Sequence, residues 1–261
     1  MIAPGSQFDF VIDHYPDISI KYDEHHCRAG SGVIRVCILS GDQKLPLQWK
    51  KFLRSSDNKK AFLHFLADEW SRQSYVSAQL TDSKVMFVND NELCYRLQRA
   101  SDGTILREEI SALECNHAEA DTRLILHAAH AGNSGHRCII IKSPDTDVAV
   151  LAIVHRAQIN GKALFLTGTK HRHRYVNISH IASHLGPLVC NSLLGMYTLT
   201  GCDTTSAFAG KGKVQGLKLS HQILIFSKLF SLLDKTLFWT SKHFSLSKQL
   251  YVHCMVIQVT I

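Results

Sequence analysis

The chain has 261 residues, of which 45% are hydrophobic and 20% are charged, the ordinary balance of a globular protein with room for one large core. Its formal charge of +7 is a mild excess that only weakly favours polyanionic partners. The longest apolar tracts fall short of the roughly 18 residues of a membrane span, and residues 1–5 lack the features of a secretory signal. With eight scattered cysteines and no CxxC pair, we expect an intracellular protein, nuclear or cytoplasmic, that is not secreted.

The first part of the chain predicts strands and one helix. Residues 8–13 form a short apolar strand that ends on Asp13, and residues 33–39 favour a second strand. Apolar residues between 62 and 70 recur with helical spacing. Residues 84–88 predict a further strand, bounded by a polar turn.

The centre alternates between the two kinds of element. Helices are expected at 120–131, 148–154, 181–185 and 189–199, and strands at 138–141, 163–166 and 175–178. This alternation predicts an α/β fold with a mostly parallel sheet. We place one domain at 8–213 and a helical appendage at 214–261. His127 and His130 lie off the apolar stripe of their helix and are expected at the surface.

Two aspartates follow the apolar strand at 138–141. Asp145 and Asp147, in Ser-Pro-Asp-Thr-Asp, would lie at the carboxyl end of that strand, where open sheets bind ligands. In extended backbone their i,i+2 spacing directs both side chains the same way. For this motif alone, capping of the next helix is an equally good interpretation.

Three further carboxylates stand in similar positions. Glu119 and Asp121 stand at the start of the helix at 120–131, and Asp203 follows Gly201. Taken singly, the first two favour compensation of the helix dipole and the third favours a turn. Gathered together, the five carboxylates would repel one another unless a cation neutralised them. Hard oxygen ligands of this kind suit Mg²⁺ or Mn²⁺, and two such ions can promote phosphodiester cleavage.

The order of these motifs resembles the acidic motifs of the PIN-like superfamily. The phrases are Glu119-Ala-Asp-Thr-Arg-Leu124, Ser143-Pro-Asp-Thr-Asp-Val148 and Leu199-Thr-Gly-Cys-Asp-Thr-Thr-Ser-Ala-Phe208, followed by Gly210-Lys-Gly-Lys213. They look like the flap endonuclease/XPG branch, and within it like animal PIN-like proteins associated with mobile elements. The resemblance covers about residues 8–213.

The resemblance implies a three-layer, Rossmann-like nuclease domain that binds DNA or RNA. It implies that Glu119, Asp121, Asp145, Asp147 and Asp203 hold the metal ions, with Asp13 as an additional acidic residue. Family nucleases begin with a strand that carries a central aspartate, and no residue before Phe8 supplies it. The first strand of the fold is therefore expected to be missing.

Basic residues are the candidate contacts to nucleic acid. By resemblance, Lys211 and Lys213 belong to a loop that grips duplex phosphates, and Lys21 takes the place of a basic residue at the scissile phosphate. For Lys21, a solvated surface lysine is the favoured interpretation. Lys170, Arg172 and Arg174 stand in a basic run that either contacts phosphate or forms a solvated hairpin.

Three functions remain in competition. The first is a metal-dependent nuclease. The second is a phosphatase of the haloacid dehalogenase type with Asp145 as nucleophile, which the scarcity of later acidic residues disfavours. The third is a catalytically inactive nucleic-acid-binding or interaction protein that retains the nuclease fold.

Overall fold

The chain folds around one mixed eight-stranded sheet. The computed structural model describes residues 7–14, 36–44, 46–72, 80–81, 83–169, 172–200, 212–222 and 255–260. The strand order is β4-β3-β2-β1-β8-β5-β6-β7. The strands are β1 (Gln7–Val11), β2 (Val85–Asp90), β3 (Leu93–Arg99), β4 (Ile105–Glu109), β5 (Cys138–Lys142), β6 (Lys162–Thr169), β7 (Arg172–Asn177) and β8 (Met255–Thr260).

Six α-helices accompany the sheet in the described part of the chain. They are α2 (Trp49–Phe52), α3 (Ser56–Arg72), α5 (Ala120–Asn133), α6 (Thr146–Val154), α7 (Ile178–Leu199) and α8 (Lys213–Gln222). A 3₁₀ turn, η1 (Ser111–Leu113), precedes α5, and a second, η2 (Arg156–Gln158), follows α6. The predicted break between two helices is confirmed as a kink inside α7, where Gly186 adopts φ 74° directly before Pro187.

The expectation of a mostly parallel sheet is wrong, because the sheet is mixed. Parallel pairing joins β1 to β2 and β5 to β6, whereas the other neighbouring strands pair antiparallel. The connections between β2, β3 and β4 are too short for a crossover, so they give hairpins. The strands β3 and β4 were not predicted, and residues 36–39 of the predicted strand at 33–39 form no strand.

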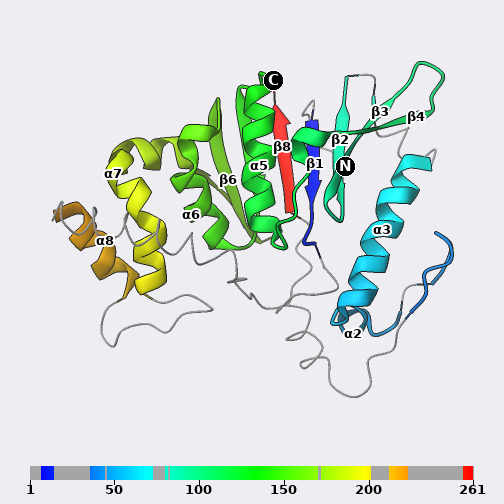
Figure 1. Ribbon diagram of the computed structural model, residues 1–261, viewed down its shortest axis with the longest axis horizontal. Helices are drawn as coiled ribbons and strands as arrows, with labels where there is room; N and C mark the ends of the chain where they lie inside the picture. Colours follow the sequence, from blue (N-terminus) through cyan, green and yellow to red (C-terminus); the bar gives the residue numbers. More distant parts are fainter. Residues whose placement is uncertain are drawn as a thin grey trace.

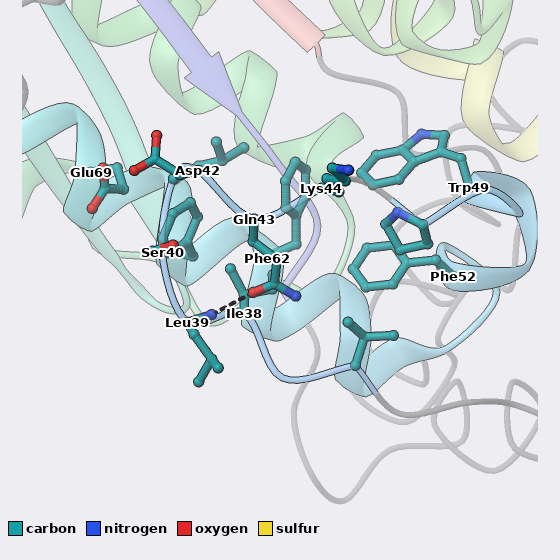
Figure 2. Close-up of a pocket in the computed structure, with 15 residues that line it drawn as sticks. Ile38, Leu39, Ser40, Asp42, Gln43, Lys44, Trp49, Phe52, Phe62 and Glu69 are labelled. Carbon is teal, nitrogen blue, oxygen red and sulfur yellow. Dashed lines mark hydrogen bonds between the residues drawn. The ribbon is translucent and has the colours of Figure 1, made fainter.

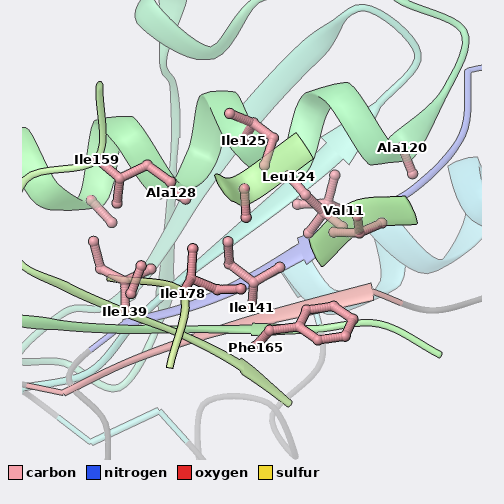
Figure 3. Close-up of a cluster of buried hydrophobic side chains, with 14 residues drawn as sticks. Val11, Ala120, Leu124, Ile125, Ala128, Ile139, Ile141, Ile159, Phe165 and Ile178 are labelled. Atoms are coloured by element: carbon pink, nitrogen blue, oxygen red, sulfur yellow. The ribbon is translucent and has the colours of Figure 1, made fainter. Parts of the chain in front are cut away.

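Helices cover both faces of the sheet, which gives three layers. The side chains alternate along β1 and the residue that follows it, so that Phe10 and Ile12 pack with Leu63 of α3 while Val11 packs under α5. Figure 3 shows Leu124 of α5 above the strand residues of its cluster. Burial of each such side chain stabilises the fold by about 1.5–3 kcal/mol.

The C-terminal residues complete the middle of the sheet. The sequence predicts a helical appendage over 214–261, and α8 is helical, but residues 255–260 form β8 between β1 and β5. Figure 1 shows this last strand, in red, beside the blue β1. Because β8 is antiparallel to both neighbours, β1 and β5 run in the same direction. Residues 255–260 therefore belong to the sheet.

Candidate metal centre

Asp13 joins the end of β1 to the beginning of α5. Its Oδ1 accepts a hydrogen bond of 2.9 Å from the backbone N–H of Ala120, the first residue of the helix. The N-cap residue itself, Glu119, makes no capping hydrogen bond with its side chain. A backbone hydrogen bond from His14 to Ala118 adds a second link. The structure thus places Asp13 beside the segment that carries Glu119 and Asp121, where the helix N-terminus favours negative charge.

Asp145 and Asp147 occupy the corresponding place between β5 and α6. Asp145 is the N-cap of α6, and its Oδ1 accepts a hydrogen bond of 2.9 Å from the backbone N–H of Asp147. The buried Ser143 supports this turn, because its Oγ accepts from the backbone N–H of Asp145 at 3.0 Å. The capping interpretation of Asp145 is therefore confirmed. Both aspartates remain partly exposed, so capping and a role in ligand binding are compatible.

These two sets of carboxylates share one edge of the sheet. Since β1 and β5 are parallel, their carboxyl ends lie at the same edge, separated by β8 and hence by roughly 10 Å, two strand spacings. Within the described part of the chain, no three Asp, Glu, His or Cys residues lie close enough to hold one metal ion. The structure brings Asp13 to Glu119 and Asp121, and Asp145 to Asp147, but it does not gather all of them into one cluster.

The arrangement fits Mg²⁺ or Mn²⁺ better than a metal that needs a closed cage. Mg²⁺ is commonly bound through one or two carboxylates and completes its octahedron with water and substrate phosphate. Each set of acidic residues offers such a partial shell at a partly exposed edge. The residues that could hold an ion in this way are Asp145 and Asp147 at one position, and one or two of Asp13, Glu119 and Asp121 at the other.

The predicted basic contacts are only partly within the described chain. Arg172 and Arg174 are exposed on β7, the edge strand, so the basic run lies within a strand and not before it. Lys213 is the first residue of α8. Outside the described residues lie the metal candidate Asp203 and the basic candidates Lys21, Lys170 and Lys211.

Tyr197 is a site residue that the sequence did not indicate. Its hydroxyl donates a hydrogen bond of 2.5 Å to Oδ1 of Asp147. The ring of Tyr197 lies under the ammonium group of Lys213, with Nζ 4.1 Å from the ring centroid. A tyrosine within an apolar helix gives no sign of either contact, since both depend on how α6, α7 and α8 pack.

A buried histidine–aspartate pair lies under α5, where surface histidines were expected. His127 is wholly buried, and its Nδ1 is 2.8 Å from Oδ2 of Asp9, which is also wholly buried. Oδ1 of Asp9 accepts from the side chain of Gln7 at 2.8 Å. His130 is only half-buried, and burial lowers its pKa. The expectation of surface histidines is thus wrong for His127, because α5 also contacts β1 through a polar stripe beside its apolar one.

Arg123 extends this buried polar region toward the acidic edge. Its guanidinium is fully buried and donates to the backbone carbonyls of Asn91 and Cys115. Burial lowers the pKa of Arg123, and it also lowers that of His14, which the charge of Arg123 lowers further. The sequence contained one sign of this buried polar region, namely the charged residue Asp9 between Phe8 and Phe10 in an otherwise apolar strand.

A separate cavity of about 740 Å³ lies between residues 36–44, Pro46 and helices α2 and α3. Figure 2 shows its aromatic residues Trp49, Phe52 and Phe62. The rings of Trp49 and Phe52 stack with centroids 5.1 Å apart. None of the predicted carboxylates or basic residues lines this cavity, so it is distinct from the acidic edge.

Comparisons of the chain with models of protein families, with curated proteins and with solved structures find no match. No helix in the described part of the structure has the length and hydrophobicity that crossing a membrane requires.

Proposed function

We propose that this chain is a divalent-metal-dependent phosphodiesterase of the nuclease type, with a PIN-like three-layer domain and Mg²⁺ or Mn²⁺ as cofactor. The observation that carries the proposal is the capping of α5 by Asp13. This contact places Asp13, Glu119 and Asp121 at the sheet edge to which β5 also delivers Asp145 and Asp147. Asp203 is included on the resemblance alone.

The chemistry follows from what these residues can hold. Bound metal ions would supply an activated water and stabilise the leaving oxygen of a phosphodiester. The carboxylates hold the ions, and the N-termini of α5 and α6 make this edge a favourable place for negative charge. The exposed Arg172 and Arg174 and the more enclosed Lys213 supply positive charge for phosphates, so binding should weaken as salt rises.

Metal-dependent cleavage tests the proposal directly. The purified chain is incubated with labelled flap, hairpin and single-stranded DNA and RNA, with Mn²⁺, with Mg²⁺ or with EDTA. We expect cleavage with the metals that is lost in Asp145→Asn/Asp147→Asn. Asparagine caps helices as well as aspartate does, so this variant removes charge while keeping the start of α6.

The control is Asp102→Asn, which neutralises an exposed carboxylate in the turn between β3 and β4. It should cleave as the unaltered chain does. Cleavage that survives the double substitution would refute the carboxylate site.

A second candidate function is that of a catalytically inactive nucleic-acid-binding or interaction protein with the same fold. Two observations favour it: the described acidic residues form no group of three, and β8, at the centre of the sheet, contains no acidic residue. Salt-dependent binding of nucleic acid without cleavage under any metal would support this alternative over the nuclease.

A further inference from the structure

We infer that Tyr197 is a positioning residue that orients Asp147 for metal binding; this inference rests on the proposed function. The two residues come from different helices, Asp147 from the first turn of α6 and Tyr197 from the last turns of α7. The hydrogen bond of 2.5 Å between the Tyr197 hydroxyl and Oδ1 of Asp147 joins them.

This hydrogen bond restricts the carboxylate. A hydrogen bond to a charged acceptor is shorter and about twice as strong as one between neutral groups. With Oδ1 held from α7, rotation of the carboxylate group about its last torsion would break the bond, so the plane of the group is fixed. Groups that orient a metal-binding side chain in this way typically contribute about 10- to 100-fold to metal affinity.

Tyr197 is itself fixed in place by its surroundings. The half of α7 that carries it packs through the buried residues Leu193 and Met196 against α6 and α8. Gly216 of α8 lies so close to this helix that an added Cβ would be 2.9 Å from Cγ of Met196. The close approach of α8 places the ammonium group of Lys213 over the ring of Tyr197.

Tyr197 also contacts Lys213, so it connects the proposed metal ligand with a basic residue. The hydroxyl of Tyr197 contacts the carboxylate proposed to hold the metal, and its ring contacts the lysine proposed to bind phosphate. The two residues nevertheless differ in how they should affect a bound cation. Tyr197 orients a ligand, whereas Lys213 adds positive charge nearby, which opposes binding of a second cation.

Binding of Mn²⁺ to the full chain provides the test, with free Mn²⁺ measured by electron paramagnetic resonance. In Tyr197→Phe, which keeps the ring and loses the hydroxyl, we expect Mn²⁺ affinity to fall by about tenfold or more. In Lys213→Met we expect it to be unchanged or slightly higher, because a nearby positive charge is removed. The matched control is Tyr95→Phe, since Tyr95 also lies under a cation, with the guanidinium of Arg107 3.7 Å from its ring centroid.

Thermal unfolding in EDTA and in Mn²⁺ separates orientation from a merely structural role. If Tyr197 orients Asp147, Tyr197→Phe should leave the midpoint in EDTA close to that of Tyr95→Phe and reduce the increase that Mn²⁺ produces. A lower midpoint in EDTA together with an unchanged Mn²⁺ affinity would assign Tyr197 a structural role and overturn the inference.

The outcomes also distinguish the inference from the function on which it rests. If the unaltered chain binds no Mn²⁺, or if Asp147→Asn binds it equally well, the proposed metal site fails. If binding depends on Asp147 but Tyr197→Phe stays within about twofold of the unaltered chain, the metal site stands and the role of Tyr197 is refuted.

Discussion

Replacing His127 with leucine should destabilise the protein strongly, because it leaves the carboxylate of Asp9 without its histidine partner in a part of the core that excludes water. Both side chains of the pair are 0% exposed. Removal of one partner from a buried pair of this kind typically costs about 3–5 kcal/mol, since the carboxylate of Asp9 stays buried and loses the hydrogen bond to its Oδ2. This is a large share of the roughly 5–15 kcal/mol by which a domain is stable.

The double variant Asp9→Leu/His127→Leu should recover much of this loss. Replacing a buried pair by apolar residues of similar size is often neutral or stabilising. The cost that remains is the side chain of Gln7, which donates to Asp9 and would lose its acceptor, at about 1–3 kcal/mol. We therefore expect the double variant to lie within about 3 kcal/mol of the unaltered protein.

Urea unfolding, followed by circular dichroism, measures all three free energies of unfolding. The decisive comparison is between the double variant and His127→Leu. A double variant that is no more stable than the single one would show that the cost does not come from an uncompensated buried charge, and the reasoning would be refuted.

Three further predictions concern pH, a turn and a buried cation. Burial lowers the pKa of His14 and His130, so below about pH 6.5 the unfolded chain binds more protons than the folded chain. The urea concentration at the unfolding midpoint should therefore decrease as the pH is lowered from about 7 to about 5. A midpoint that stays constant over this interval would contradict the lowered pKa of the two histidines. Gly168→Ala should destabilise the β6–β7 hairpin by more than the roughly 1–2 kcal/mol of backbone strain expected for the control Gly135→Ala. Both glycines have positive φ, but an added Cβ at 168 would lie 2.1 Å from the carbonyl oxygen of Arg172, whereas an added Cβ at 135 would have no atom within 4 Å. Equal thermal midpoints for the two variants would refute this prediction. Arg123→Lys should lower the free energy of unfolding by several kcal/mol although it keeps the charge. One ammonium group cannot reproduce the planar guanidinium that donates to the carbonyls of Asn91 and Cys115. A lysine variant with unchanged stability in urea would argue against those contacts.

Apolar patterns within short stretches of sequence predicted the helices and strands that these patterns specify on their own. The apolar stripe of α5 and the run Cys138-Ile-Ile-Ile141 were enough to place the helix and strand at the centre of the fold. The hairpin of β3 and β4 was missed because much of it faces solvent, which leaves no regular alternation. The turn before this hairpin, between β2 and β3, has a non-glycine residue at positive φ, Asn91, a conformation that asparagine adopts more readily than most other residues.

The candidate site was predictable in its parts but not in its arrangement. The position of Asp145 after an apolar strand indicated both its capping role and its place at the carboxyl edge. That Asp13 caps α5, that Tyr197 holds Asp147 and that His127 is buried against Asp9 all depend on contacts between distant parts of the chain. No window of sequence contains both members of such a pair.

The central position of β8 also determines the order in which the protein can fold. Gln7 in β1 pairs with Val259 in β8, so nearly the whole chain must be closed into a loop before the middle of the sheet exists. Contacts of such high sequence separation make folding slow, and they cannot form during synthesis until β8 has left the ribosome. Until then β1 and β5 each present an unpaired edge, so this protein should depend on chaperones more than its size alone suggests.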